Sequence, residues 1–222
     1  MDDAVEVMVK RLDVRPEAVS AGAAVLSDEE RDRARRFVFD RDRHRYIVAR
    51  GVLRESLAAR LGVRPQAVEL VYGERGKPAL APRLATSGLR FNVSHSEDVA
   101  VYAFSSAGDV GIDVEAVRTL PDADDVATRV FSGRENAAYR ALDPRDRPLG
   151  FFQCWTRKEA FIKALGQGLY YPLDRFDVSL APGEPAKLLR IEKSPEDRRR
   201  WCMTGFFPVQ GFVAAVVAED PR

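Results

Sequence analysis

The spacing of apolar side chains changes along the chain between a helical and a strand-like period. Apolar residues recur at helical spacing over residues 44–61, and this run stops at Gly62, a residue type that commonly ends helices. A second such helix is predicted over residues 148–165. Short apolar runs predict strands at residues 91–93, 99–104, 110–117 and 212–218. Because these elements alternate without the regular spacing of βαβ units, the pattern predicts an α+β fold with largely antiparallel sheets.

Two shorter segments add detail. Ser27 is followed by three acidic residues ending at Glu30, which is the pattern of a capping box, so a helix is expected to begin directly after Ser27. Residues 94–98 are polar and are expected to join the strands at 91–93 and 99–104 as a loop. No Gly/Ser/Pro-rich linker marks a domain boundary in the sequence.

Two acidic residues share one face of the strand predicted at 110–117. Because side chains alternate along a strand, Asp113 and Glu115 point the same way, about 7 Å apart. A hard cation such as Mg²⁺ commonly takes one or two protein carboxylates and completes its shell with phosphate and water. The pair is therefore a candidate half of a metal site, although acids at this spacing also occur on ordinary solvated strand faces.

The helix predicted at 148–165 carries charged residues beside an apolar stripe. Lys158 falls in the middle of that stripe, so it either has a charged partner or anionic ligand, or reaches the surface along its stem. Glu159 and Lys163 lie one turn apart at the edge, as an acid and a base at a cleft or as a surface salt bridge. The stripe consists of Phe151, Cys154, Trp155, Phe161, Ile162 and Leu165. The residues expected to face away are Gln153, Arg157, Ala160 and Ala164.

Further polar side chains lie at a strand end and in a turn. Ser94 and His95 follow the strand at 91–93, and Lys77 stands in the turn Gly76-Lys77-Pro78. The candidate anion-binding residues are thus Lys77, Ser94, His95, Lys158, Lys163 and Arg45, and the candidate cation ligands are Asp113, Glu115 and Glu159. This is the inventory that a Mg²⁺-assisted phosphoryl-group enzyme requires.

Charge is distributed unevenly, although the 222 residues carry a net charge of only +1. Residues 31–60 contain ten arginines and four acids, a local charge of +6, whereas residues 109–125 contain six acids and one arginine, a local charge of −5. The small total gives no bulk electrostatic reason to expect binding to nucleic acid or a membrane surface. The two segments suggest either two solvated faces or an anionic ligand on the first and a cation on the second.

The remaining composition indicates an ordinary globular protein of the cytoplasm. Hydrophobic residues make up 45% of the chain, but the longest strongly apolar run, residues 211–218, is too short to span a bilayer. The first residues are acidic and contain no unbroken apolar segment of the secretory type. Cys154 and Cys202 each lie beside a tryptophan and are expected to be free thiols rather than a disulfide.

Taken in order, four motifs resemble the surfactin-synthetase-type 4′-phosphopantetheinyl transferases. The similarity extends over about residues 27–180 and is specific because four separate motifs agree in order and spacing. The motifs are Gly76-Lys77-Pro78, Phe91-Asn92-Val93-Ser94-His95-Ser96, Gly111-Ile112-Asp113-Val114-Glu115, and Trp155-Thr156-Arg157-Lys158-Glu159-Ala160-Phe161-Ile162-Lys163 with Gly166-Gln167-Gly168-Leu169.

The resemblance implies both an architecture and an activity. It implies two similar α/β halves in a pseudo-twofold arrangement, residues 1–107 on the coenzyme A side and 108–222 on the metal and catalytic side, with the active site at their junction. Such enzymes transfer the phosphopantetheine arm of coenzyme A to a serine of an apo acyl- or peptidyl-carrier protein, with Mg²⁺ or alternatively Mn²⁺. The implied partners are coenzyme A and the carrier, with no nucleic acid or membrane, and the implied state is a cytoplasmic monomer.

The same resemblance assigns roles to individual residues. Asp113, Glu115 and Glu159 would hold the metal, Glu159 would also deprotonate the carrier serine, and Lys163 would contact the pyrophosphate. The residues implied to bind coenzyme A are Arg33, Arg45, Gly76, Lys77, Pro78, Ser94, His95, Lys158 and Lys163, together with Asp113 and Glu159 at the metal. A second basic residue often found before the Arg33 position is Glu30 here, for which Arg31 or Arg36 is a candidate substitute.

Three points stay open on the sequence alone. A Mg²⁺-dependent hydrolase of coenzyme A or nucleotide pyrophosphates would use the same acids and lysines, and a non-catalytic relative would bind without turnover. The apolar residues Leu169, Tyr170 and Tyr171 are candidates either for carrier docking or for core packing. The natural carriers are not encoded in any feature of this sequence.

Overall fold

The computed structural model describes residues 5–73, 76–167, 170–192 and 195–220. The chain forms two compact units, of which unit 1 contains Met1–Met8, Leu89–Glu97 and Val101–Arg222 and unit 2 contains Val9–Gly88 and Asp98–Ala100. The division passes through β1 (Val5–Arg11) and β5 (Val99–Ser105). The halves 1–107 and 108–222 expected from the resemblance, and their pseudo-twofold relation, stay predictions.

Unit 1 is built around one long helix and a small antiparallel sheet. The sheet consists of β6 (Val110–Ala116), β10 (Phe212–Glu219) and β9 (Trp201–Phe206), in that order. Its strands are antiparallel, with Asp113 opposite Ala215. The helices of this unit are α5 (Ala123–Val130), α6 (Gly133–Ala141) and α7 (Arg147–Ala164). The remaining strands are β4 (Arg90–Ser96), β7 (Phe176–Val178) and β8 (Leu188–Ile191).

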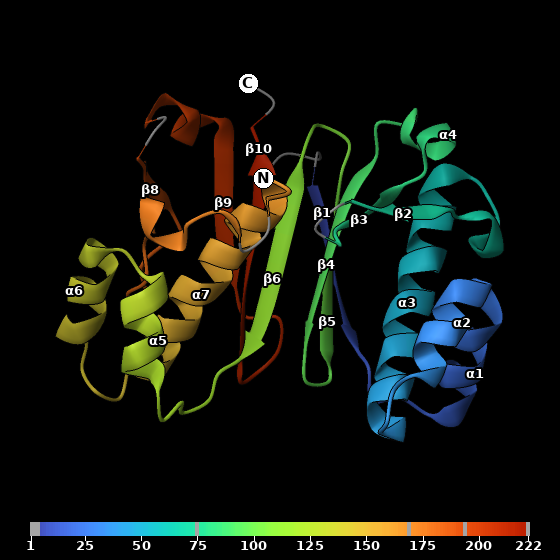
Figure 1. The fold of residues 1–222 in the computed structure, drawn as a ribbon, viewed down its shortest axis with the longest axis horizontal. Coiled ribbons are helices and arrows are strands. Elements are labelled where there is room, and N and C mark those ends of the chain that lie inside the picture. Colours follow the sequence, from blue (N-terminus) through green and yellow to red (C-terminus); the bar gives the residue numbers. More distant parts are fainter. Residues whose placement is uncertain (1–4, 74–75, 168–169, 193–194, 221–222) are drawn as a thin grey trace. The chain divides into compact units, whose positions relative to one another are not determined.

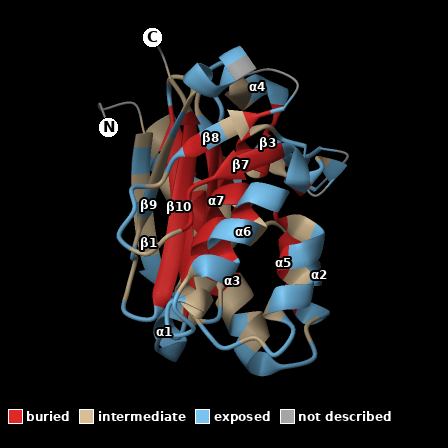
Figure 2. Cartoon of the chain, turned by 90° about the vertical axis from the view of Figure 1, so that its left-hand side faces the viewer, coloured by how far each residue is buried: buried red, intermediate tan, exposed pale blue. Residues whose placement is uncertain are grey.

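The core of unit 1 lies between α7 and this sheet. Figure 1 shows α7 running along β6, and Figure 2 shows α7 and β10 buried over most of their length. Aromatic rings fill the other side of α7, where the ring centroids of Phe161 and Phe176 are 4.8 Å apart. Because α7 is covered on nearly every side, buried residues occupy most of its circumference rather than one stripe, and they include the polar Gln153, Arg157 and Lys158.

Unit 2 is mainly helical. Helix α2 begins with the expected capping box, in which the Ser27 hydroxyl accepts the Glu30 N–H while the Glu30 carboxylate accepts the Ser27 N–H. Helix α3 ends at Gly62 as predicted, and Gly62 adopts the left-handed conformation that is common after a helix. The elements of this unit are α1 (Pro16–Val25), α2 (Asp28–Arg35), α3 (Asp40–Leu61), β2 (Leu70–Tyr72), β3 (Pro78–Leu80) and α4 (Pro82–Ala85).

The α+β class with small antiparallel sheets is confirmed, and two local expectations are corrected. Residues 94–96 continue strand β4, so only Glu97 and Asp98 join β4 to β5. The face of α7 formed by Gln153, Arg157, Ala160 and Ala164, expected to point away, is buried. No helix in the described ranges combines the length and apolar composition needed to cross a membrane. Both cysteines are free, as expected.

Candidate functional site

Strand β6 places two carboxylates beside strand β4. Asp113 is 4% exposed, and Glu115, two residues further on the same face, is half-buried. Although both strands belong to unit 1, they lie in different sheets and are joined by side chains. Strand alternation turns Asn92, Ser94 and Ser96 of β4 to one face, and each of them bonds to β6.

The bonds that join the two strands define what we call the β4–β6 seam. The Asn92 side-chain oxygen accepts the Ile112 N–H at 2.8 Å, and the Ser94 hydroxyl donates to Asp113 Oδ1 at 2.7 Å. The Ser96 hydroxyl donates to Glu115 Oε2 at 2.8 Å and accepts the Ala116 N–H at 3.2 Å. The seam therefore fixes the two acids through hydroxyl groups instead of a backbone ladder.

Helix α7 brings Glu159 and Lys163 to the same place. The Lys163 ammonium donates to Asp113 Oδ1 at 2.6 Å and to the Ser94 hydroxyl at 3.1 Å. The helix can approach because Gly111 of β6 has no side chain: a Cβ there would lie 2.1 Å from the Ala160 carbonyl oxygen. Lys163 thus pairs with Asp113, which favours the alternative of an acid and a base at a cleft over a surface salt bridge between Glu159 and Lys163.

Two carboxylate oxygens at this place lack a partner. Asp113 Oδ2 and Glu159 Oε1 are both buried and accept no hydrogen bond within the described part of the chain. Burial and the neighbouring Asp113 and Glu115 carboxylates raise the pKa of Glu159 to about 7, against the lowering effect of Lys163. Burial also raises the pKa of Glu115, with Asp113 contributing, while the Ser96 hydroxyl opposes the shift. The site therefore holds a carboxyl that exchanges its proton near neutral pH.

The residues present fit a divalent cation in part. In the described residues, no three His, Cys, Asp or Glu side chains are close enough together to hold a metal ion as they stand. Asp113 Oδ1 is occupied by Lys163 and Ser94, but Asp113 Oδ2 and Glu159 Oε1 are unpaired carboxylate oxygens, the ligand type that Mg²⁺ prefers. These two oxygens favour a bound cation, because a buried carboxylate oxygen without a partner costs free energy unless something binds it.

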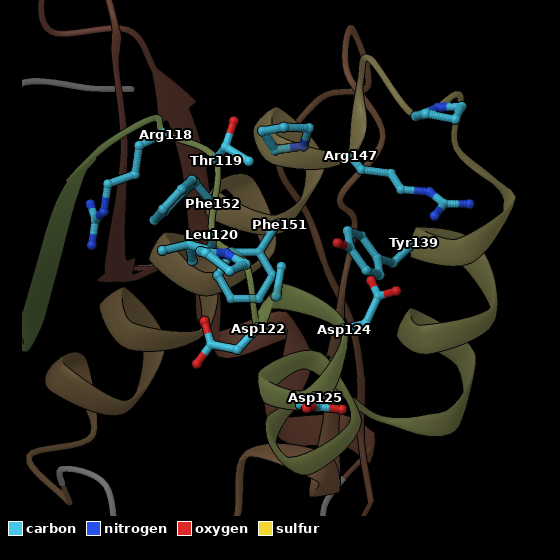
Figure 3. A pocket seen from close by; sticks show the side chains of 14 residues that line it. Arg118, Thr119, Leu120, Asp122, Asp124, Asp125, Tyr139, Arg147, Phe151 and Phe152 are labelled. Carbon is cyan, nitrogen blue, oxygen red and sulfur yellow. The ribbon is translucent and has the colours of Figure 1, made fainter.

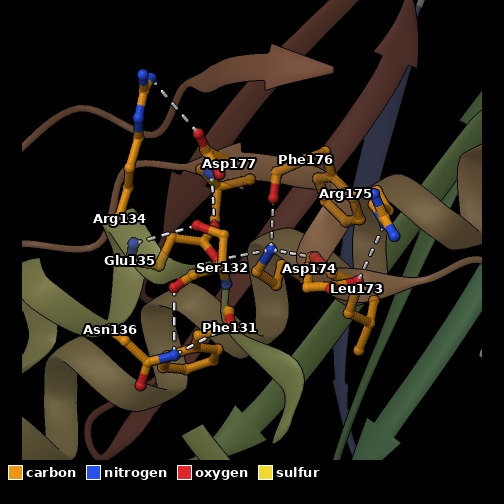
Figure 4. Close-up of polar contacts among 12 residues, drawn as sticks. Phe131, Ser132, Arg134, Glu135, Asn136, Leu173, Asp174, Arg175, Phe176 and Asp177 are labelled. Atoms are coloured by element: carbon orange, nitrogen blue, oxygen red, sulfur yellow. Dashed lines mark hydrogen bonds and ion pairs between the residues drawn. The ribbon is translucent and has the colours of Figure 1, made fainter. Parts of the chain in front are cut away.

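Lys158 does not belong to this place, which corrects its expected role in binding coenzyme A. Lys158 is buried, and its ammonium lies 2.7 Å from the Glu135 carboxylate of α6. It also donates to the carbonyl oxygens of Leu173 and Phe176. Figure 4 shows these two residues together with Glu135. All its donors are therefore used inside unit 1, and no side-chain atom is left for a ligand.

The sequence motifs do not single out Glu135 as the partner of Lys158. Glu135 also accepts the N–H groups of Ser132 and Val178. The spacing of Ser132 and Glu135 is that of a capping box, like the one recognised at Ser27, and it could have placed Glu135 at a helix start. That its carboxylate also meets a lysine 23 positions further on depends on tertiary packing, which no local pattern encodes.

The basic residues expected to bind coenzyme A phosphates lie in unit 2. Arg33 stacks over the Tyr46 ring at 5.5 Å, and Arg45 forms two 2.7 Å bonds with the Asp13 carboxylate. Glu30, the departure from the family pattern, is buried and pairs with Arg54 and Arg50. An acid at this position therefore holds α2 against α3 and is not turned to a ligand.

Arg31 and Arg36, the two candidates to replace the basic residue that Glu30 displaces, have different surroundings. Arg31 is engaged by Asp28 and the Ala23 carbonyl, whereas Arg36 lines a cavity of about 660 Å³ together with Arg33. Arg36 is thus the better placed substitute. In the turn 76–78, Gly76 has a φ of 76° and Lys77 is half-buried.

His95 and Ser94 are separated by strand alternation. Ser94 faces Asp113 in the seam, whereas His95 is exposed on the other face of β4. The two residues therefore cannot contact the same atom of a ligand through one face of the strand.

A pocket of about 290 Å³ begins three residues after Glu115. Arg118 lies 3.7 Å from the Glu115 carboxylate and over the Phe152 ring at 5.1 Å. Figure 3 shows Leu120, Phe151 and Phe152 near the middle of this pocket, with Arg118 on one side and Tyr139 and Arg147 on the other. The pocket thus combines an apolar floor with the cations Arg118 and Arg147 and with the acids Asp122, Asp124 and Asp125, which also line it.

The three residues after α7 named as docking candidates have different environments. Tyr170 is 82% exposed, whereas the Tyr171 ring packs against those of Phe161 and Phe176. Of its two predicted roles, carrier docking and core packing, Tyr171 therefore has the second. Leu169 lies outside the described residues.

Two family models together match nearly the whole chain. The first, the 4′-phosphopantetheinyl transferase superfamily, matches residues 109–217. The second, 4′-phosphopantetheinyl transferase, N-terminal, matches residues 14–107.

Individual proteins are similar over most of the chain. The 4′-phosphopantetheinyl transferase HetI of Nostoc sp. is 41% identical over 87% of this chain and 78% of its own length. The 4′-phosphopantetheinyl transferase Sfp of Bacillus subtilis is 34% identical over 88% of this chain and 83% of its own length. Among solved structures, the holo-[acyl-carrier-protein] synthase (AcpS) of Thermotoga maritima is 24% identical, with a TM-score of 0.39 over 51% of this chain and 64% of its own.

Proposed function

Because the chain belongs to the 4′-phosphopantetheinyl transferase superfamily, in its Sfp type, we propose that it modifies apo acyl- or peptidyl-carrier proteins with coenzyme A as donor. The resemblance drawn from the sequence motifs is thereby confirmed. In the proposed reaction the carrier serine oxygen bonds to the phosphorus that bears the pantetheine arm. The bond from that phosphorus to the bridging oxygen breaks, and adenosine 3′,5′-bisphosphate leaves with that oxygen.

The observation that supports the proposal best is the Glu159 carboxyl, whose Oε1 is buried and accepts no hydrogen bond from the described residues. A general base works best when its pKa lies near the working pH, and the pKa of Glu159 is raised to about 7 by burial and by the other two acids. Its unpartnered Oε1 can accept the serine proton. Glu159 therefore supplies the base that the attacking hydroxyl needs.

Lys163 and the two strand acids complete the proposed site. The Lys163 ammonium, held by Asp113 and Ser94, would turn to the pyrophosphate and offset its charge. Asp113, Glu115 and Glu159 would hold Mg²⁺ or Mn²⁺, with Asp113 Oδ2 as an unpaired oxygen available to the ion. When bound, such an ion would neutralise phosphate charge and stabilise the leaving phosphate.

The other roles taken from the family stay proposals. Arg33, Arg45 and His95 are proposed to bind the phosphates of coenzyme A, with Ser94 and the turn Gly76-Lys77-Pro78 at its adenosine and phosphate groups. Arg45 would have to exchange its bonds with Asp13 for bonds to phosphate. A cytoplasmic, monomeric protein with no nucleic-acid or membrane partner remains the prediction from the sequence.

The pocket beside Glu115 and the exposed Tyr170 are proposed to receive the carrier. The rings of Phe151 and Phe152 offer apolar contact, and Arg118 and Arg147 can pair with acidic side chains of the carrier, while Asp122, Asp124 and Asp125 in the same lining can pair with basic ones. Comparing the rates at which different apo carrier domains are modified would identify the natural partners.

One experiment tests the function directly. The protein is incubated with coenzyme A, Mg²⁺ and an apo carrier domain, and the carrier is then weighed by intact mass spectrometry. We expect a gain of one phosphopantetheine, which Asp113→Ala and Glu159→Gln abolish while both variants keep the wild-type circular dichroism. Wild-type turnover in either variant would sink the assignment of the site.

The same assay separates the transferase from the hydrolase alternative. Adenosine 3′,5′-bisphosphate should form only when the apo carrier is present and in equal amount to the modified carrier. Its release without any carrier would identify a hydrolase that uses the same acids.

A further inference from the structure

Besides Lys158, α7 carries a second buried charged group, which lies on a different side of the helix from the half-buried Glu159. Arg157 is 3% exposed, and its Nη1 donates to the Ser179 carbonyl at 2.6 Å and to the Ser179 hydroxyl at 3.0 Å. Its Nη2 reaches the Glu184 carbonyl at 3.4 Å. In the described part of the chain, no carboxylate forms an ion pair with Arg157. A buried cation with only neutral partners is costly, so an anion at this place would be stabilised.

One edge of the Arg157 guanidinium borders a narrow gap beside Gly205 of β9. A Cβ at position 205 would stand 3.5 Å from Nη2, 3.7 Å from Nε and 3.1 Å from the Ala186 Cβ. Both nitrogens belong to the edge that Ser179 does not use, and Nη2 also donates to the Glu184 carbonyl. A guanidinium edge carries two parallel N–H groups, which match the two oxygens of a carboxylate.

The edge opens on a cavity of about 210 Å³ that has a second unsatisfied polar group. Gln153, one helical turn before Arg157, also lines it and is 7% exposed. The Gln153 side-chain oxygen is buried and accepts no hydrogen bond within the described residues. The cavity thus presents a cation and, one turn away, an acceptor that lacks a donor.

The rest of the cavity wall is mixed, because Thr156 and the exposed Glu184 line it beside apolar residues. Pro185, Phe206 and Val213 line it, and Phe207, which also lines it, is largely exposed. A ligand that fits must therefore be small and must combine an anionic end, a hydrogen-bond donor and an apolar part. A single guanidinium balances one negative charge, which favours a carboxylate over a phosphate dianion.

We propose that this cavity binds a small organic carboxylate, with the carboxylate on the Nε–Nη2 edge of Arg157 and an adjacent N–H or O–H group on the Gln153 oxygen. The ligand class is that of short N-acyl amino acids and hydroxy acids. Such a molecule satisfies both buried groups at once and covers the apolar part of the wall with its side chain. The site is separate from the proposed transferase chemistry and needs neither coenzyme A nor a metal.

N-acetyl-L-alanine is the probe, and its binding is measured by titration calorimetry in metal-free buffer without coenzyme A. A Kd of about 1 mM is expected, since only one charge pair and a small apolar surface contribute. N-acetyl-L-alaninamide, which lacks the carboxylate, serves as the matched ligand and should not bind. Inorganic phosphate should bind more weakly than N-acetyl-L-alanine.

Two variants test the position of the site. Arg157→Met keeps the length of the stem but removes the charge, and Gly205→Ala fills the gap while keeping Arg157 and its bonds to Ser179. Each should weaken binding at least about tenfold. Arg145→Met, which removes an exposed arginine elsewhere in unit 1, should bind like wild type.

If Arg157→Met does not fold, the affinity of Gly205→Ala for N-acetyl-L-alanine tests the position of the site. The proposal is overturned if N-acetyl-L-alanine does not bind the wild-type protein, if Gly205→Ala binds it equally well, or if the amide or phosphate binds as tightly as the carboxylate. None of these outcomes depends on transferase turnover, so the two proposals can fail independently.

Discussion

Glu159 has a carboxyl group that is costly to ionise in the folded chain. Its pKa is about 7 there and has its ordinary value of 4.5 when the chain unfolds. Below about pH 4.5 the group is neutral in both states and costs nothing, whereas above pH 7 the folded state holds a buried charge. The folded chain therefore binds more protons and loses stability as the pH rises through this window.

Glu159→Gln should remove this pH-dependent cost. In metal-free buffer at about pH 8 we expect the variant to melt several degrees above wild type, which corresponds to a difference in unfolding free energy on the order of 1–3 kcal/mol. At about pH 4.5 the two proteins should melt at the same temperature. Differential scanning calorimetry at both pH values measures this. Added Mg²⁺ should raise the melting temperature of wild type more than that of the variant. Equal melting at both pH values would show that Glu159 is not buried as described.

Lys158 and Glu135 form a second pair with a different role. Lys158→Met leaves the Glu135 carboxylate buried without a cation and should destabilise the fold by about 3–5 kcal/mol. Thermal unfolding measures this, and coenzyme A affinity of the folded variant should match wild type within about threefold. The double variant Lys158→Met with Glu135→Leu removes both charges and should recover much of the loss. Normal melting with weakened coenzyme A binding would instead make Lys158 a ligand contact.

At the scale of elements, the site depends on how closely α7 approaches β6. A methyl group at position 111 would lie 2.1 Å from the Ala160 carbonyl oxygen and 2.3 Å from the Ala164 nitrogen, so helix and strand would have to separate. That movement would displace Glu159 and Lys163 from Asp113. The absence of a side chain at Gly111 therefore sets the distance of Glu159 and Lys163 from Asp113.

Gly111→Ala should lower both stability and transferase rate. We expect a loss of about 1–3 kcal/mol in unfolding free energy and at least about a tenfold loss in kcat. Gly133→Ala is the matched control, because a Cβ there meets nothing within 4 Å and the residue begins α6. The control should leave kcat unchanged and slightly raise stability. A normal kcat in Gly111→Ala would mean that the contact is slack.

Sequence patterns predicted elements whose signals are local. The cap at Ser27, the stop at Gly62 and the strand at 110–117 depend on neighbouring residues and were found to within a residue or two. Helix α3 begins at Asp40, four residues before the predicted start, because charged residues of its first turns hide the helical period. Residues 94–96 looked like a loop because Ser94 and Ser96 are polar, yet their hydroxyls bond to β6.

The same limit applies to the site. Asp113, Glu115, Glu159 and Lys163 could be named from motifs, and the structure brings Lys163 onto Asp113. The pairing of Lys158 with Glu135, the buried state of Arg157 and the internal use of Glu30 depend on which elements meet in space. A helical wheel assumes one buried face, and α7 is buried on almost all of them.

For the molecule as a whole, the net charge of +1 conceals two opposed segments. Residues 31–60 carry +6 and include Arg33 and Arg45, whereas residues 109–125 carry −5 and include Asp113 and Glu115. The cationic segment suits a ligand with several phosphates, and the acidic segment suits a cation. Electrostatic attraction of this kind is screened by salt, with a Debye length of about 10 Å at 0.1 M.

The KM for coenzyme A should therefore rise with ionic strength. Between about 0.05 M and 0.5 M NaCl we expect an increase of several-fold in KM, with a smaller change in kcat at saturating carrier. Sucrose at matched osmolality is the control, because it does not screen charge. A constant KM would show that phosphate contacts contribute little to coenzyme A binding.

The β4–β6 seam also has a consequence for amide hydrogen exchange. The Ile112 N–H is protected by the Asn92 side chain and the Ala116 N–H by the Ser96 hydroxyl, so each proton depends on one side chain. Asn92→Ala should expose the Ile112 amide to solvent exchange while its neighbours in the β6–β10 ladder stay protected. Anything that draws Ser96 away from β6 during turnover would register as faster exchange at Ala116, which makes these two amides built-in reporters of the strand that carries the acids.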